Sequence, residues 1–188
     1  MIKPIVIATI ATACLAGCVL LPSGKRRLIT LKNRTAIPTS VDYNRIVTLD
    51  ALVRPGDDTR RWSSSNAATI EGYVLAVVAA NVEAANGFLP NKRDVHIEVS
   101  RRRDAPQRER VILEVTPPMR VWAKTRGWDW SSDGLAHDLV GRLCRFEGWL
   151  LFDAEHVKEA ENTNPGGAGN WRATAWELHP ITSITVVN

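Results

Sequence analysis

Acidic and histidine side chains recur in short phrases of the second half of the chain, and these residue types bind metal ions or move protons. Asp94 and His96 are two positions apart, which on a strand places both side chains on the same face. The full set is Asp94, His96, Glu114, Asp153, His156, Glu177 and His179. Such carboxylates and imidazoles could hold a divalent cation or serve as general acid and base.

A metal site would have to be assembled from distant parts of the chain. Zinc takes three or four ligands, and no His-Glu-x-x-His or Cys-x-x-Cys motif supplies them locally. If Zn or Mn were bound, His96, His156 and His179 would be the metal ligands. Together with Asp94 and Glu114 they would then form the catalytic centre of a hydrolase acting on nucleic acid or a phosphoester. The alternative is that the histidines only make structural hydrogen bonds. The absence of a local motif favours this alternative, in which the protein has neither a cofactor nor an enzymatic role.

Tryptophan is the second residue type with a chemical use, since the chain contains seven. Indole rings stack on sugars and on unpaired bases, and neighbouring positive charges attract the ligand's anionic groups. The candidates for stacking on a ligand are Trp149, Trp171 and Trp176. The alternative for each is packing in the core of a small domain.

Five strand-like runs must position these side chains. They cover residues 68–80, 94–99, 110–116, 141–152 and 171–178, the last with a continuation over 184–187. The second run alternates strictly, which predicts a half-buried strand with Val95, Ile97 and Val99 on its inner face. Gly72 in the first run would permit the coil or bulge that a barrel strand needs. Pro117 and Pro118 end the third run.

A short helix is expected near residues 132–140, between the third and fourth strands. Three strands, a helical crossover and two strands are the order of an OB-fold barrel. We therefore predict a mainly β protein with a five-stranded OB-like barrel and one short helix. In this arrangement Cys144 alternates with Phe146 on the inner face, which indicates a buried, inert thiol. The chain contains no Gly-x-Ser-x-Gly elbow, phosphate-binding loop or dinucleotide fingerprint.

Several local phrases resemble those of small exported bacterial proteins with predicted OB-like domains. The phrases are Glu71-Gly72-Tyr73-Val74, Asp94-Val95-His96-Ile97, Glu114-Val115-Thr116-Pro117, Phe146-Glu147-Gly148-Trp149-Leu150 and the run from Trp171 to Pro180. The resemblance extends over most of residues 68–187. It implies an architecture and carries no mechanism.

The N-terminus has the layout of a secretory signal, with Lys3 followed by a short apolar run over residues 4–13. Leu15-Ala16-Gly17-Cys18 resembles the lipobox of bacterial lipoproteins. That resemblance implies cleavage before Cys18 and diacylglycerol on its thiol, so the protein would be anchored in the cell envelope. Val19 in place of aspartate would favour the periplasmic face of the outer membrane in a Gram-negative cell. An ordinary signal peptide or an anchor helix is the alternative.

Positive charge is concentrated directly after the expected anchor. Residues 19–62 carry nine basic and four acidic side chains, whereas residues 63–188 carry fourteen and sixteen. We therefore expect a signal peptide over 1–17, a basic, irregular tether over 18–62 with a possible short strand at residues 45–49, and the barrel over 63–188. The acidic body argues against nucleic acid as the partner, and the basic tether suits anionic lipid head groups.

These observations favour a membrane-anchored binding or assembly module for an envelope protein or glycan. The metal-dependent hydrolase and a purely structural lipoprotein are the alternatives. The sequence does not indicate an oligomeric state.

Overall fold

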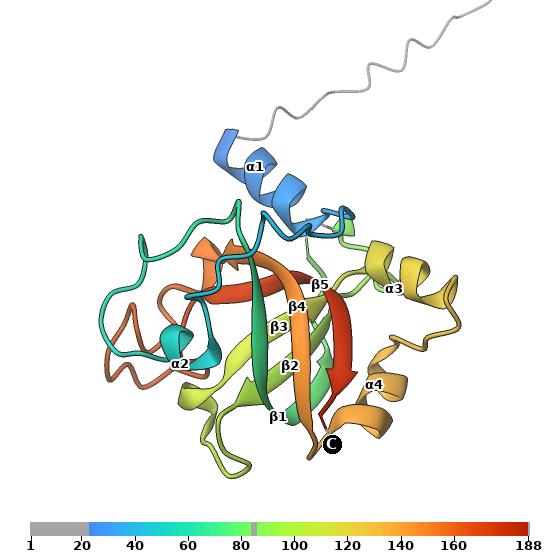
Figure 1. Ribbon diagram of the computed structural model, residues 1–188. Coiled ribbons are helices and arrows are strands. Elements are labelled where there is room, and N and C mark those ends of the chain that lie inside the picture. The colour runs from blue at the N-terminus through green and yellow to red at the C-terminus, as the bar shows by residue number, and fades with distance from the viewer. Residues whose placement is uncertain (1–22, 84–85, 188) are drawn as a thin grey trace, which may run out of the picture.

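The computed structural model describes residues 23–83 and 86–187, and Figure 1 shows how their elements are arranged. The helices are α1 (Ser23–Lys32), α2 (Leu49–Leu52), α3 (Pro117–Lys124) and α4 (Ser132–Leu139), with single 3-10 turns η2 (Gln107–Glu109) and η3 (Ala154–His156). The strands are β1 (Ala67–Ala79), β2 (Val95–Ser100), β3 (Val111–Val115), β4 (Leu143–Phe152) and β5 (Trp176–Val186).

The five strands form a closed barrel in the order β1-β2-β3-β5-β4. Neighbouring strands are antiparallel except for β3 and β5, which pair in parallel and close the barrel. This order and the helical connection between β3 and β4 confirm the predicted OB-like barrel. Alternating side chains fill its interior, and Val95, Ile97 and Val99 are all buried, as the alternation predicted. Cys144 and Phe146 also lie in the core.

Gly72 has a different role from the one expected of it. The irregularity in β1 lies between Val74 and Ala76, two residues further along the strand. A Cβ atom on Gly72 would lie 2.6 Å from side-chain atoms of Leu49 and Val99. The glycine is therefore needed because α2 and β2 approach its backbone closely.

The segment over residues 23–62 differs from the irregular tether that the composition suggested. It contains α1 and α2, and residues 45–49 form a turn and the start of α2 in place of a strand. Thr48 caps α2 by accepting a hydrogen bond from the Ala51 amide at 3.2 Å, and Leu49 and Leu52 pack into the core. Burial of these leucines explains why the segment folds against the barrel.

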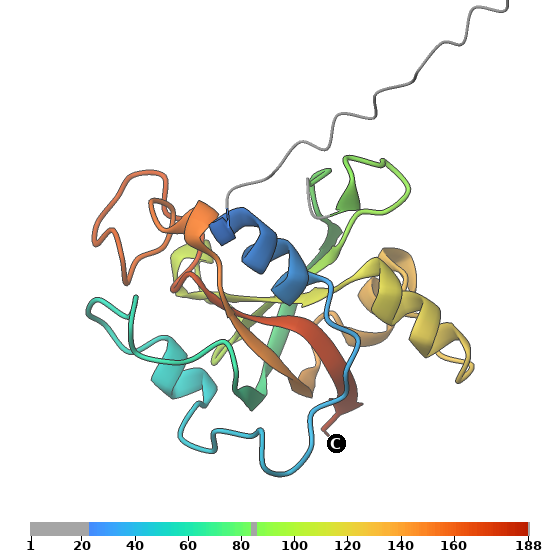
Figure 2. The same cartoon turned by 90° about the horizontal axis from the view of Figure 1, so that it is seen from above.

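The helices cover different parts of the barrel. Figures 1 and 2 show α1 over one end of it, α2 on one flank, and α3 with α4 on the opposite flank. The helix predicted near residues 132–140 is α4, and α3 is an additional helix. Among the described residues no helix is both long and apolar enough to cross a bilayer. The predicted signal peptide and Cys18 lie outside the described residues.

Candidate functional site

The end of the barrel beneath α1 contains a network of buried charged side chains. His96 on β2 faces Glu114 on β3 in the antiparallel register, and the His96 Nε2 atom lies 2.5 Å from Glu114 Oε1. The parallel pairing of Leu113 with Leu178 brings His179 beside Glu114. The Nδ1 atom of His179 lies 2.9 Å from Glu114 Oε2. One carboxylate therefore joins two imidazoles from two strands.

The network continues from His179 in two directions. Its Nδ1 atom also lies 3.2 Å from Glu177 Oε2, and the Arg172 guanidinium pairs with Glu177 Oε1 at 2.6 Å. On the other side of the ring, His179 Nε2 lies 3.8 Å from Asp94 Oδ2. Asn86 donates to the second oxygen of Asp94 at 3.1 Å.

Lys32 of α1 connects the remaining members. Its ammonium lies 2.9 Å from Glu83 Oε2 and 3.3 Å from Asp153 Oδ2. Asp153 in turn pairs with His156 Nδ1 at 3.1 Å. All seven ionisable residues singled out in the sequence are thus gathered in one region of the molecule. Lys32, Glu83 and Arg172 belong to the same network and were not among the candidates.

Burial and charge shift the acid–base equilibria of this network strongly. Burial alone would lower the pKa of His179, but the charges of Glu114 and Glu177 outweigh it and raise the pKa to about 10. Burial raises the pKa of Asp94 to about 7, although the charge of His179 opposes this shift. Burial would also raise the pKa of Glu114, yet His179 and His96 hold that pKa well below its usual range.

The network is sealed from solvent at its centre. His179, Asp94 and Glu114 are exposed by 0%, 1% and 2%. These three groups therefore have almost no surface for contact with a substrate, whereas general acid–base catalysis requires such contact; His96 and His156 are partly exposed, at 16% and 28%.

In the part of the chain that the structure describes, three groupings have the residue types and proximity for a cation, with one ligand atom of each residue within 4.8 Å of the others. They are Glu83, His96 and Glu114; Asp94, Glu114 and His179; and Asp153, His156 and Glu177. The carboxylates of the first and third groupings already face Lys32 or Arg172, and Glu114 already joins two imidazoles. Carboxylates and imidazoles are ligands that would suit Zn or Mn. In this structure, however, the carboxylates already pair with the Lys32 ammonium, the Arg172 guanidinium or the imidazoles.

The three tryptophans proposed for stacking are all engaged by the protein. Trp176 is 2% exposed and belongs to the core. The Trp149 indole donates to the Ala36 carbonyl at 2.7 Å and lies under the guanidinium of Arg34. The Trp171 indole donates to Glu159 at 2.5 Å. None of the three lines either of the two cavities described here.

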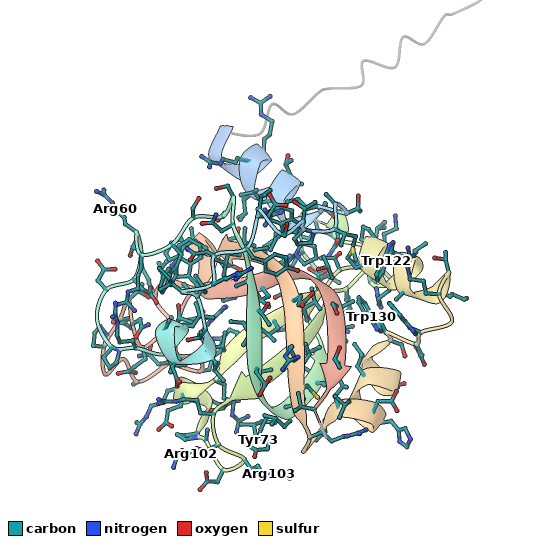
Figure 3. The ribbon with its side chains drawn as sticks, viewed as in Figure 1. Arg60, Tyr73, Arg102, Arg103, Trp122 and Trp130 are labelled. Atoms are coloured by element: carbon teal, nitrogen blue, oxygen red, sulfur yellow. The ribbon has the colours of Figure 1, made fainter. Side chains whose placement is uncertain are left out.

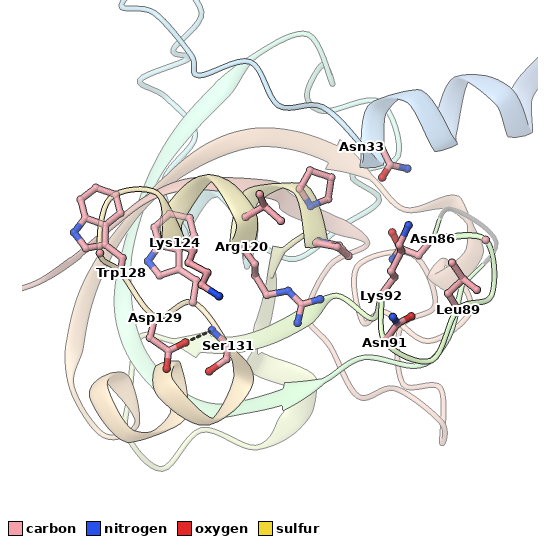
Figure 4. A pocket seen from close by; sticks show the side chains of 16 residues that line it. Asn33, Asn86, Leu89, Asn91, Lys92, Arg120, Lys124, Trp128, Asp129 and Ser131 are labelled. Atoms are coloured by element: carbon pink, nitrogen blue, oxygen red, sulfur yellow. Dashed lines mark hydrogen bonds between the residues drawn. The ribbon is translucent and has the colours of Figure 1, made fainter.

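A groove of about 1130 Å³ lies on the flank that carries α3. One wall is the β1–β2 connection with Asn86, Asn91 and Lys92, and the opposite wall is α3 and the segment after it. Figure 4 shows Trp128 at one end, the asparagines and Lys92 at the other, and Arg120 and Lys124 between them. We refer to this cavity as the α3 groove.

Trp128 is held as a rigid platform in the α3 groove. Its ring stacks on that of Trp130 at 5.8 Å with an interplanar angle of 17°, and Trp122 packs edge-on against it at 5.6 Å. Figure 3 shows Trp122 and Trp130 together on this flank. Trp128 remains 48% exposed. Three tryptophans between residues 122 and 130 are the only sequence signal that points to this site.

A second cavity of about 630 Å³ lies near the loop over residues 38–48. Tyr43 lines it and donates to Glu147 at 3.1 Å. Burial and the charge of Glu147 raise the pKa of Tyr43 to about 12, so the phenol stays protonated. This cavity lacks an exposed aromatic ring and carries one cationic side chain, Arg45.

Comparisons of the chain with protein-family models, with curated proteins and with solved structures found no match.

Proposed function

We propose that the protein is a lipid-anchored binding module of the cell envelope whose α3 groove holds an anionic glycan. The observation that carries the proposal is the exposed, rigidly held ring of Trp128 in a groove that also contains amides and cations. Aromatic faces stack on sugar rings, and barrels of this topology commonly bind oligosaccharides and oligonucleotides. A fixed platform loses little entropy when a ligand binds.

The polar residues of the groove suit hydroxyl-rich ligands. The exposed side chain of Asn91 offers amide donors and an acceptor oxygen. Lys92 and Lys124 are exposed and add positive charge, which favours a ligand that carries carboxylates. Asp129 also lines the groove, and its charge repels a polyphosphate backbone, with one charge per nucleotide, more than a glycan with fewer carboxylates. A glycan therefore fits better than nucleic acid.

The lipobox supports the location. Lipid on Cys18 would hold the protein at the membrane surface, and two or more acyl chains give nearly permanent attachment. In this proposal the buried charge network is structural, because its central groups are closed to substrate. The proposal therefore includes no metal and no catalytic step.

Titration of the mature protein with anionic oligosaccharides tests the groove, with indole fluorescence as the readout. A neutral oligosaccharide, an acidic peptide and a single-stranded oligonucleotide serve as comparisons. We expect Trp128→Ala to weaken glycan binding roughly five- to hundredfold, because loss of one stacking ring costs about 1–3 kcal/mol. Trp149→Phe is the control, since Trp149 lies outside the α3 groove. Equal affinity of the Trp128→Ala variant, or preferential binding of the acidic peptide, would exclude the glycan.

The anchor is tested separately by the mass of the protein purified from membranes. We expect a mass that corresponds to cleavage before Cys18 with added acyl chains. A Cys18→Ala variant should lose both the lipid and membrane retention. Normal processing and retention of that variant would contradict the lipoprotein assignment.

A further inference from the structure

We propose that Lys32 is a positioning residue of the α3 groove, so that the helix next to the predicted anchor completes the ligand site. This inference rests on the proposed function, because it concerns how that same site is held in shape. The inference goes beyond the proposed function because it assigns a role in the ligand site to a segment that was predicted to be a tether.

The β1–β2 connection forms one wall of the groove, and several contacts fasten it, among them the hydrogen bond from Arg120 of α3 to the Arg93 carbonyl at 2.8 Å. Glu83 pairs with Lys32 at 2.9 Å, and Asn86 donates to Asp94 at 3.1 Å. Arg93 closes the connection at its far end by donating to the carbonyl oxygens of Ala79 and Ala80. The Glu83–Lys32 pair joins the start of this connection to α1.

Lys32 is an unusual side chain for a helix on the surface of a barrel. It is 2% exposed, and its ammonium faces both Glu83 and Asp153. Burial would lower the pKa of Lys32, but the charges of Glu177, Glu114, Asp153 and Glu83 outweigh it and raise the pKa. The ammonium therefore stays charged and pairs with Glu83, just before the residues of the connection that line the groove.

The residues after Lys32 fix the position of α1 on the barrel. Asn33 lines the α3 groove directly. Arg34 donates to the carbonyl oxygens of Ser64 at 2.7 Å, Leu150 at 3.0 Å and His179 at 3.2 Å. Figure 4 shows Asn33 at the end of α1, above the groove. Displacement of α1 would thus move one lining residue and release the Glu83 contact of the wall.

The geometry also limits how far the groove can lie from the membrane. Cys18 precedes Ser23, the first residue of α1, by five positions, and an extended chain spans roughly 3.5 Å per residue. A lipid on Cys18 would therefore hold α1 within about 18 Å of its attachment point.

Amide hydrogen exchange of the full-length protein tests this role without any ligand. We expect Lys32→Met to increase exchange in residues 86–93 at least tenfold while the barrel strands keep their protection. Glu83→Gln should give the same local increase, because it removes the same ion pair and leaves Lys32 facing Asp153. Arg61→Met is the matched control, since Arg61 donates to backbone carbonyls of residues 54–57.

The double variant separates positioning from general stability. If the pair acts as a unit, the double variant Lys32→Met/Glu83→Gln should exchange less than twofold faster than either single variant. Each single variant should weaken glycan binding at least fivefold. Unchanged exchange in residues 86–93 of Glu83→Gln, or an equal increase in every strand, would overturn the proposal. Because Glu83→Gln keeps the Lys32–Asp153 pair, it decides the matter even if Lys32→Met fails to fold. Absence of glycan binding by the unmodified protein would refute the proposed function and leave the exchange result to decide the role of Lys32.

Discussion

Replacement of Glu114 by glutamine tests whether the buried network stabilises the barrel. The variant keeps the shape of the side chain and removes the charge shared by His96 and His179. The pKa of His179 rises from 6.5 to about 10 in the folded protein, which corresponds to roughly 5 kcal/mol at 1.36 kcal/mol per pKa unit. Glu177 contributes part of this effect. Because removal of one partner from a buried ion pair costs about 3–5 kcal/mol, we expect a loss of about 3–4 kcal/mol.

Urea unfolding at pH 6 and at pH 9 measures this effect. His179 has a raised pKa, so its stabilising contribution is complete below the unfolded value of 6.5 and is lost as the pH rises toward 10. The unmodified protein should therefore lose stability over this range, and Glu114→Gln should show a smaller loss. Glu71→Gln is the control, since its exposed pair with Arg145 at 2.9 Å should contribute less than about 1 kcal/mol. A cost below about 1 kcal/mol for Glu114→Gln, or an unaltered pH dependence, would refute this reasoning.

Three further predictions concern the barrel. The melting temperature should be highest at mildly acidic pH. Because the pKa of Asp153 is lowered in the folded protein, the stabilisation by its carboxylate is lost in strong acid. Because the pKa of Asp94 is raised to about 7, the stability falls as the pH rises from about 4 to 7. A maximum above pH 8 in a melting series would contradict this. Gly148→Ala should lower the unfolding free energy by roughly 1–3 kcal/mol or more, because its Cβ would lie 2.5 Å from the backbone oxygen of Pro180 on β5. Unfolding curves that superimpose on those of the unmodified protein would show that β4 and β5 can move apart to accept the methyl group. Cys144 should react with a thiol reagent at least a hundred times more slowly in the native protein than in urea, because it is buried and burial raises its pKa; comparable rates would place the thiol outside the core.

The strands could be predicted because their alternation is a local property. The second expected strand, residues 94–99, corresponds to β2 at Val95–Ser100, and the fourth, residues 141–152, corresponds to β4 at Leu143–Phe152. The predicted strand order places β3 between β2 and β5, but the pairing of Glu114 with His96 and His179 also depends on the register, which the sequence does not indicate.

The groove and the role of α1 could not be predicted in this way, because they depend on contacts between distant segments. Pro117 and Pro118 were interpreted only as the end of a strand, although proline also favours the first turn of a helix and here begins α3. Lys32 lies 51 residues from Glu83 in the sequence. The basic, weakly apolar sequence around Lys32 does not indicate which carboxylate its ammonium contacts.

The position of the network within the barrel suggests why buried charge is retained there. β3 and β5 close the barrel in parallel, and their register consists of the single pair Leu113 and Leu178. The Glu114–His179 ion pair crosses this same seam next to that register pair. Buried ion pairs often stabilise little compared with apolar residues of the same size, but they can specify one arrangement over others. A shifted register at the seam would leave Glu114 and His179 unpaired at a cost of several kcal/mol. The network therefore favours the observed closure of the barrel over closures with a shifted register.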